Sequence, residues 1–170
     1  MSRDYPSRLF FLGALLYSLM STLLSAEELP KADNVLVEKE KRTLTLLREG
    51  KVLKTYQVAL GNEPLGHKEE EGDGRTPEGI YRIDWRNPKS KYHLSLHISY
   101  PNEKDIARAK KAGVSPGGDI MIHGLPNGWT ALAATHRLTD WTIGCIAVTN
   151  EEIKEIWDSV ADGTPIEIRP

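Results

Sequence analysis

The stretch that decides the fold reads TIGCIAVTN at residues 142–150, and a second apolar stretch, IMIHG, precedes it at residues 120–124. Each stretch joins a short apolar run to a glycine and to one reactive side chain, Cys145 in the first and His123 in the second. Short apolar runs bounded by glycine are typical of buried strands. We therefore expect a short buried strand at each of the two stretches.

Cys145 is the only cysteine of the chain, so no intrachain disulfide can form. A lone cysteine with a histidine elsewhere in the sequence is typical of a thiol nucleophile and its base. Such a nucleophile needs a neighbour that lowers its pKa from about 8.5. The alternative is that Cys145 is an inert buried side chain and His123 a satisfied polar group at a strand end.

The two stretches resemble the signature of the L,D-transpeptidase catalytic domain family. The shared features are His-Gly, a gap, Ser/Thr-x-Gly-Cys-hydrophobic, and Asn five residues after the cysteine. The resemblance covers residues 32–170, and residues 1–26 form a separate N-terminal segment. Two positions depart from the family pattern: Ile143 stands where the family usually has His, and Ala147 where it often has Arg. The gap from His123 to Cys145 is also a few residues longer than is common in the family.

The resemblance implies roles for four residues of the two stretches. Cys145 would be the nucleophile and His123 the general acid and base. The backbone carbonyl of Gly124 would orient the ring of His123. The backbone N–H of Gly144 would contribute to an oxyanion hole, where glycine permits close approach of a substrate.

Four more residues are candidates for binding substrate: Asp73, His136, Trp141 and Thr142. Asp73 lies in the run GDGRTPEGIY at residues 72–81, which looks like the corresponding run beside the family's cleft. His136 is also a rival base for Cys145. Thr142 is an equally good candidate for a purely structural role.

No metal ion or organic cofactor is expected. The acidic residues of the loop at residues 69–78 do not have the spacing of a calcium loop. His93 and His97 share one face of an expected strand but would lie about 13 Å apart, at about 3.3 Å per residue. That separation is too large for one metal ion.

Length and composition favour one ordinary globular domain with an N-terminal extension. The chain has 170 residues, with 27% charged and 39% hydrophobic side chains. Its formal net charge of −2 excludes the basic footprint of a nucleic-acid-binding protein.

Residues 1–26 have the layout of a secretory signal peptide. Arg3 and Arg8 precede an uncharged run at residues 9–24, which is shorter than the roughly 20 residues of a spanning helix. We expect cleavage after Ala26 and export to the periplasm or cell envelope. Membrane association is expected only in the alternative case of a retained anchor.

The patterns in the rest of the chain predict a mainly β fold with a few α-helices. The resemblance implies an L,D-transpeptidase-like β-sandwich or mixed sheet with the cleft at one edge and with Cys145 and His123 on neighbouring strands beside it. Strands are expected near residues 34–39, 42–48, 51–60, 80–83, 92–100, 120–123 and 164–169. A helix capped by Asn102 should run to residue 111 with Ile106 and Ala109 inward. A short helix is expected at residues 129–137, and a last one after the capping box at residues 149–152.

The resemblance implies an exported cysteine acyltransferase acting on peptidoglycan stem peptides. Cys145 would form a thioester and pass the acyl group to an amine, giving a 3→3 crosslink or anchoring a lipoprotein. The alternatives are a hydrolase using the same site (an L,D-carboxypeptidase, or an amidase that releases attached lipoprotein), a non-catalytic wall-binding module, and a structural exported β protein.

Overall fold

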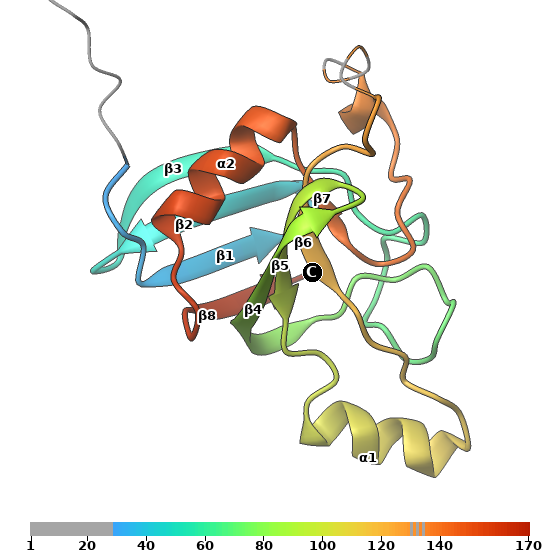
Figure 1. The fold of residues 1–170 in the computed structure, drawn as a ribbon. Coiled ribbons are helices and arrows are strands. Elements are labelled where there is room, and N and C mark those ends of the chain that lie inside the picture. The colour runs from blue at the N-terminus through green and yellow to red at the C-terminus, as the bar shows by residue number, and fades with distance from the viewer. Residues whose placement is uncertain (1–28, 130, 132, 134) are drawn as a thin grey trace, which may run out of the picture.

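A computed structural model of the chain describes residues 29–129, 131, 133 and 135–170, and it is mostly β (Figure 1). The expected signal peptide, and Thr130, Leu132 and Ala134 of the expected short helix, lie outside the described residues. In chain order the elements are β1 (Asn34–Glu38), β2 (Thr43–Arg48), β3 (Lys51–Gln57), β4 (Gly79–Ser90), β5 (His93–Ile98), α1 (Glu103–Ala112), β6 (Met121–His123), η2 (His136–Leu138, a 3-10 helix), β7 (Ile146–Ala147), α2 (Asn150–Ser159) and β8 (Pro165–Arg169).

The strands form one mixed sheet in the order β3-β2-β1-β8-β4-β5-β6-β7. The β1–β8 and β6–β7 pairs are parallel, and the other pairs are antiparallel. Strand β4 is the longest, and its ladder to β5 shifts register twice. Such irregularities bend a strand, so β4 can pair with β8 at one end and with β5 at the other. The mixed, mainly β architecture confirms the fold expected from the sequence.

The short strand β7 is held on both sides. It pairs with β6 on one side, and on the other Ala147 exchanges two backbone hydrogen bonds with Ala59, at 2.9 and 2.8 Å. Ala59 follows β3, the strand at the opposite end of the sheet order. This contact therefore joins the two ends of the sheet and fixes the position of Cys145, the residue directly before β7.

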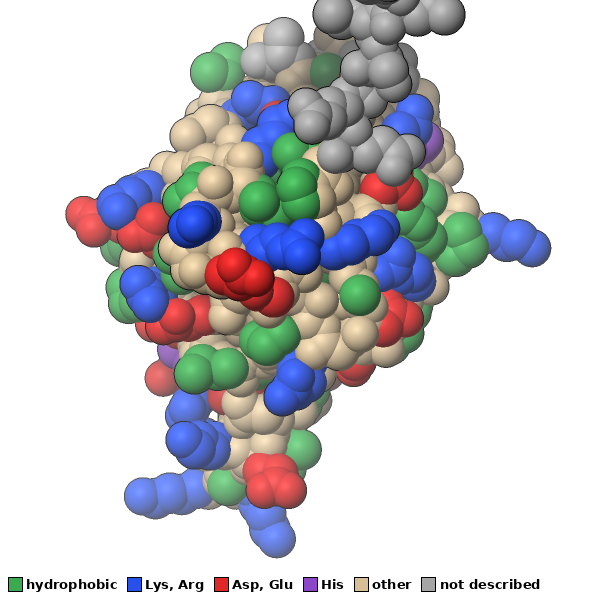
Figure 2. All heavy atoms as spheres, turned by 90° about the vertical axis from the view of Figure 1, so that its left-hand side faces the viewer, with side chains coloured by type: hydrophobic (Ala, Val, Ile, Leu, Met, Phe, Trp, Pro, Cys, Tyr) green, Lys and Arg blue, Asp and Glu red, His purple; other side chains and the backbone are tan. Residues whose placement is uncertain are grey.

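The hydrophobic core lies between the sheet and α2, which packs on one face of it (Figure 1). Ile153, Ile156 and Val160 of the last helical segment are buried, as its apolar spacing predicts. The strands contribute alternating buried side chains, among them Val35 and Val37 of β1. No helix among the described residues is long and apolar enough to span a membrane. On the face shown in Figure 2, basic and acidic side chains are interspersed.

Helix α1 begins and ends as expected, with Asn102 as its N-cap and Gly113, at φ 73°, as its C-cap. The prediction that Ile106 faces inward is wrong, because its side chain is 50% exposed. Asp105 is buried instead and accepts a hydrogen bond from the Tyr81 hydroxyl at 3.1 Å. The helix therefore packs against the domain through the buried Asp105 carboxylate as well as through Ala109. A search for apolar periodicity does not find such a buried carboxylate.

Of the helix expected at residues 129–137, the described residues show 3-10 geometry at Ala131 and in η2 at His136–Leu138. The sequence favoured a longer helix because alanine and leucine have high helix propensity. That propensity is a weak prior, since nucleating a short helix is costly.

Replacing Thr149 by Ala should remove the N-terminal cap of α2. The Thr149 hydroxyl accepts from the Glu152 N–H at 3.2 Å, and Glu152 Oε2 accepts from the Thr149 N–H at 2.9 Å. We expect Thr149→Ala to lower the free energy of unfolding by about 1 kcal/mol and the melting temperature by roughly 2–4 °C, measured by thermal denaturation. Thr149→Ser, which keeps the oxygen, should lose much less; equal losses would show that the cap contributes nothing.

Candidate active site

Cys145 and His123 are brought together by the parallel pairing of β6 with β7. Ile122 pairs with Ile146, and His123 pairs with Ala147. Cys145 lies two residues before Ala147, and alternate residues of a strand share a face. The thiol and the imidazole therefore lie on the same face of neighbouring strands. Both line one cleft of about 420 Å³.

The ring of His123 is oriented by the residue that follows it. Nδ1 lies 2.6 Å from the carbonyl oxygen of Gly124, and because a carbonyl can only accept, Nδ1 carries the proton. Nε2 is then the nitrogen with the free lone pair. Burial lowers the pKa of His123 to about 4, despite the opposing effect of the Gly124 carbonyl and with a small further decrease from His136. At neutral pH the imidazole is uncharged and able to accept a proton.

The turn after His123 is held by Asn150, the asparagine of the motif. Its side-chain Oδ1 accepts from the backbone N–H of Leu125 at 2.9 Å. A Cβ added to Gly124 would lie 2.6 Å from that oxygen and 3.0 Å from the carbonyl oxygen of Tyr92. Glycine is therefore required at position 124 for close packing, and the same packing presents its carbonyl to the imidazole.

Cys145 is half-buried and free. Its thiol donates to the carbonyl oxygen of Asp119, with an Sγ–O distance of 3.6 Å. Burial raises the pKa of Cys145, and the Asp119 carboxylate adds to this. The Met121 N–H and the Lys68 ammonium act in the opposite direction without reversing it. The expectation of a lowered thiol pKa is therefore wrong for the free protein, because the apolar surroundings disfavour the thiolate.

The backbone at Gly144 can be adopted only by glycine. Its φ is 120°, and a Cβ there would lie 2.6 Å from the carbonyl oxygen of Arg75. The Gly144 N–H donates to the Thr142 hydroxyl at 3.1 Å, and that hydroxyl donates to the carbonyl oxygen of Cys145 at 2.7 Å. Thr142 thus ties together the turn that presents the thiol, and the Gly144 N–H is engaged within this turn.

Aromatic side chains form one wall beside His123. The ring of Tyr92 lies 4.5 Å from the imidazole and that of Trp141 lies 5.8 Å away, centroid to centroid. Trp129 continues the wall, 6.1 Å from Trp141. Tyr92 and Trp141 both line the cleft.

Asp73 lies behind the cleft rather than in its lining. Burial alone would raise the pKa of Asp73. Hydrogen bonds from Lys68 and from the backbone N–H groups of Glu69, Arg75 and Glu70 outweigh that effect, so its pKa is lowered. The carboxylate organises its loop, and its partner Lys68 is the residue that reaches the cleft.

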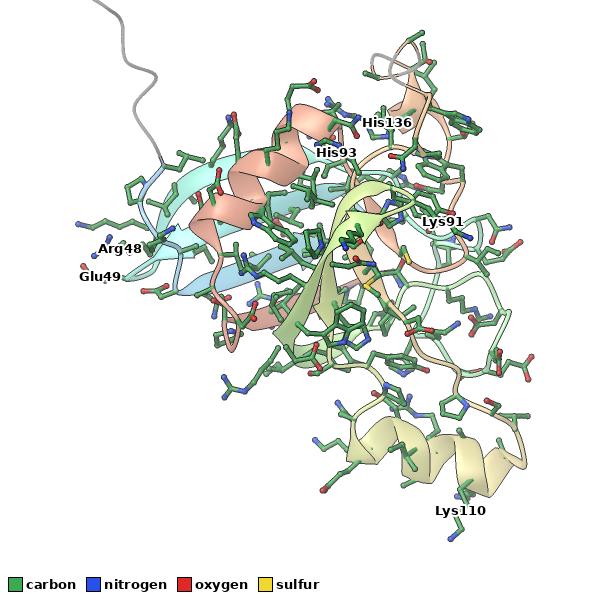
Figure 3. The ribbon with its side chains drawn as sticks, in the orientation of Figure 1. Arg48, Glu49, Lys91, His93, Lys110 and His136 are labelled. Carbon is green, nitrogen blue, oxygen red and sulfur yellow. The ribbon has the colours of Figure 1, made fainter. Side chains whose placement is uncertain are left out.

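His136 lies outside the cleft lining, on η2 (Figure 3). It is buried, its Nε2 is 3.3 Å from the Arg137 guanidinium, and Arg137 pairs with Glu152 of α2 at 2.8 Å. Burial and the neighbouring Arg137 lower the pKa of His136. The structure therefore brings His123, and not His136, into the cleft with Cys145.

Several residues of the cleft were not anticipated from the sequence: Lys68, Glu71, Tyr92 and the segment 117–119. They come from loops, whose sequences have no repeating pattern that would show which residues face the same surface. The two departures from the family pattern are also placed. Ile143 is 70% exposed at the cleft, and Ala147 is fully buried against Ala59.

No group of three or more His, Cys, Asp or Glu side chains among the described residues is arranged to hold a metal ion. His97, on β5, instead has Asp84 2.6 Å from its Nδ1.

Comparison with known proteins identifies relatives by sequence and by structure. A family model described as the L,D-transpeptidase catalytic domain matches residues 32–168. YafK of Escherichia coli, an L,D-transpeptidase by provisional assignment, is 33% identical over 129 residues, which cover 72% of this chain and 44% of YafK.

Two solved structures are also similar. Pgp2 of Campylobacter jejuni, a helical cell shape determining protein, superposes with a TM-score of 0.60 at 26% identity, over 83% of this chain and 50% of Pgp2. Bd1075 of Bdellovibrio bacteriovorus superposes with a TM-score of 0.55 at 27% identity, over 83% of this chain and 51% of Bd1075. The chain thus spans about half the length of these relatives. Because the family model matches most of the chain, this protein belongs to the L,D-transpeptidase catalytic domain family.

Proposed function

We propose that this protein is a cysteine acyltransferase that acts on peptidoglycan stem peptides. The family to which it belongs acts on such peptides. The observation that carries the proposal is the arrangement of Cys145 and His123 on one face of β6 and β7, lining a single cleft. With Nδ1 held by the Gly124 carbonyl, Nε2 of His123 is the ring nitrogen available to accept the thiol proton.

The first half of the reaction forms a thioester. The thiol gives up its hydrogen bond to the Asp119 carbonyl, Nε2 of His123 takes the proton of Cys145, and Sγ attacks the carbonyl carbon of the third stem residue. The C–N bond then breaks, and the imidazolium returns the proton to the departing amine of the terminal D-alanine. Because thiol and imidazole are both neutral at rest, His123 acts as a general base during the attack and does not hold a preformed thiolate.

The second half of the reaction transfers the acyl group. An acceptor amine attacks the thioester carbon, His123 removes its proton, and the C–S bond breaks with return of the proton to Sγ. An amine of another stem gives a 3→3 crosslink, and an amine of a lipoprotein gives anchoring. If water is the acceptor, the same steps hydrolyse the thioester. The residues are identical in all three cases, so the acceptor is decided by access to the thioester.

Backbone donors next to the nucleophile would stabilise the tetrahedral oxyanion. Each such donor contributes on the order of 3 kcal/mol to transition-state stability. The Gly144 N–H would have to exchange its bond to the Thr142 hydroxyl for one to the oxyanion. Thr142 would therefore tune this donor, besides holding the turn.

Removing either member of the pair should abolish product formation. Incubation of purified protein with muropeptides, followed by mass spectrometry, should show new crosslinks, a lipoprotein-linked product or plain tripeptides. We expect Cys145→Ala to reduce turnover to background, and His123→Ala to reduce it by about 10²–10⁴-fold, since proton transfer contributes that much.

Leu65→Ala is a suitable control, because Leu65 is 84% exposed and does not line the cleft; it should retain full turnover. Full turnover in Cys145→Ala would contradict the proposal. If the wild-type protein gives no product and Cys145→Ser binds purified cell wall as well as wild type, the chain is a binding module instead.

The alkylation rate of Cys145 should follow its raised pKa. Since this thiol is the only one in the chain, iodoacetamide reports on it alone. Iodoacetamide reacts with the thiolate, so we expect slow modification at pH 7 and a midpoint above the usual value of about 8.5, measured by mass spectrometry across pH. His123→Ala should change the rate at pH 7 little. Rapid alkylation near pH 6–7 that disappears in His123→Ala would instead reveal a thiolate–imidazolium pair.

We further propose that residues 1–26 direct export to the periplasm and are then removed. The mass of the protein recovered from the periplasmic fraction should correspond to a chain that begins at Glu27. Recovery of the full-length chain from the membrane fraction would show that the segment is retained as an anchor.

A further inference from the structure

Lys68 places a buried positive charge in the wall of the cleft. Its side chain is 3% exposed, and it lines the cleft together with Cys145 and His123. Lysine is almost never buried to this extent unless it is paired, because removing an ammonium group from water is costly. Whether this charge is fully compensated depends on the partners of its ammonium group.

The ammonium group of Lys68 has partners for two of its three N–H donors. It donates to Asp73 Oδ1 at 2.7 Å and to the carbonyl oxygen of Glu70 at 3.1 Å. No acceptor for the third donor is present in the described part of the chain. Asp73 also accepts three backbone N–H groups, from Glu69, Glu70 and Arg75. The carboxylate is thus shared among four donors, and Lys68 keeps the capacity to bind a further anion.

The loop around Lys68 is held against the far side of the cleft. The Glu71 N–H donates to the carbonyl oxygen of Ser115 at 2.8 Å, and the Ser115 hydroxyl donates to the Glu71 carboxylate at 3.0 Å. The Ser115 segment leads into Asp119, whose carbonyl accepts the Cys145 thiol. Lys68 therefore sits on a wall whose position relative to the sulfur is fixed.

Among the described residues that line the cleft, Lys68 is the single Lys or Arg. Its charge lowers the pKa of the Cys145 thiol, although the opposing effects of burial and of the Asp119 carboxylate are larger. Two acidic residues also line the cleft: the Glu71 carboxylate accepts a hydrogen bond from Ser115, and the Asp119 side chain is exposed to solvent. Of the described lining residues, only Lys68 carries a fixed positive charge that can pair with an anion. A negatively charged group entering the cleft close to the sulfur would thus meet Lys68.

We propose that Lys68 binds the terminal carboxylate of the donor peptide, on the residue that leaves when Cys145 attacks. This inference rests on the proposed function. In a peptide cleaved before its last residue, that carboxylate is separated from the attacked carbonyl carbon by only the scissile nitrogen and one Cα. It is the anion closest to the reacting bond. Lys68 is accordingly a specificity-determining residue that selects donors ending one residue beyond the bond.

The test compares two tetrapeptide stems that differ only at the C-terminus, one a free acid and the other a carboxamide. Binding is measured by calorimetry to a Cys145→Ala protein, which cannot react. We expect the acid to bind at least tenfold more tightly than the amide, because a charge-assisted hydrogen bond is lost in the amide. Adding Lys68→Gln should weaken acid binding at least tenfold, leave amide binding within about twofold, and so abolish the preference.

Two further variants separate charge from folding. Lys110→Gln removes an exposed lysine of α1 (Figure 3) and should leave the preference unchanged. In the Cys145→Ala background Lys68→Cys carries the only thiol, and its alkylation with 2-bromoethylamine restores an ammonium group of nearly the original length. That treatment should restore the preference for the acid. The result tests the charge at position 68 whether or not the Lys68→Gln protein folds well.

An acid preference that persists in Lys68→Gln, or that is absent from the Cys145→Ala protein itself, would overturn the inference. The same applies if neither peptide binds. Turnover by the wild-type protein reports separately on the proposed function. A Lys68-dependent preference without turnover would leave a carboxylate-binding site in a protein that is not a transferase.

Discussion

The parallel pairing of β6 with β7 is the constraint on which the site depends. It sets Cys145 diagonally opposite His123, although 22 positions separate them in the chain. A shift of one residue in this register would turn the thiol to the other face of the sheet. Strand β7 is only two residues long, so the register depends on neighbours on both sides, β6 and Ala59.

Hydrogen bonds that involve backbone groups orient the two residues that the strand register brings together. The Gly124 carbonyl orients His123, the Asn150 side chain holds the turn behind it, and Thr142 holds the turn that precedes Cys145. The cleft is apolar enough to keep both reactive groups neutral, with the pKa of the imidazole lowered and that of the thiol raised. This environment disfavours a preformed thiolate–imidazolium pair, since a low dielectric penalises isolated charges.

The sequence predicted elements well wherever burial imposed a period. The alternating apolar residues of β1 and the capping residues of both long helices were confirmed. The inward face of α1 was wrong because the buried Asp105 is stabilised by partners distant in sequence, Tyr81 and His67 (Nε2 to Oδ1 3.1 Å). Local patterns carry no record of such partners, and a charged side chain is expected outside by default.

From the sequence alone came the mainly β class and the glycines that flank Cys145 and His123, because these depend on residue type and on spacing within single strands. The resemblance to a family added the candidate pair of Cys145 with His123. Only the tertiary structure decided which histidine reaches the cleft, and that Asp73 supports the cleft while Lys68 lines it. It also decided that the thiol is neutral at rest. These outcomes depend on burial and on loops packed from separate parts of the chain, and desolvation is a property of the packed molecule rather than of any stretch of sequence.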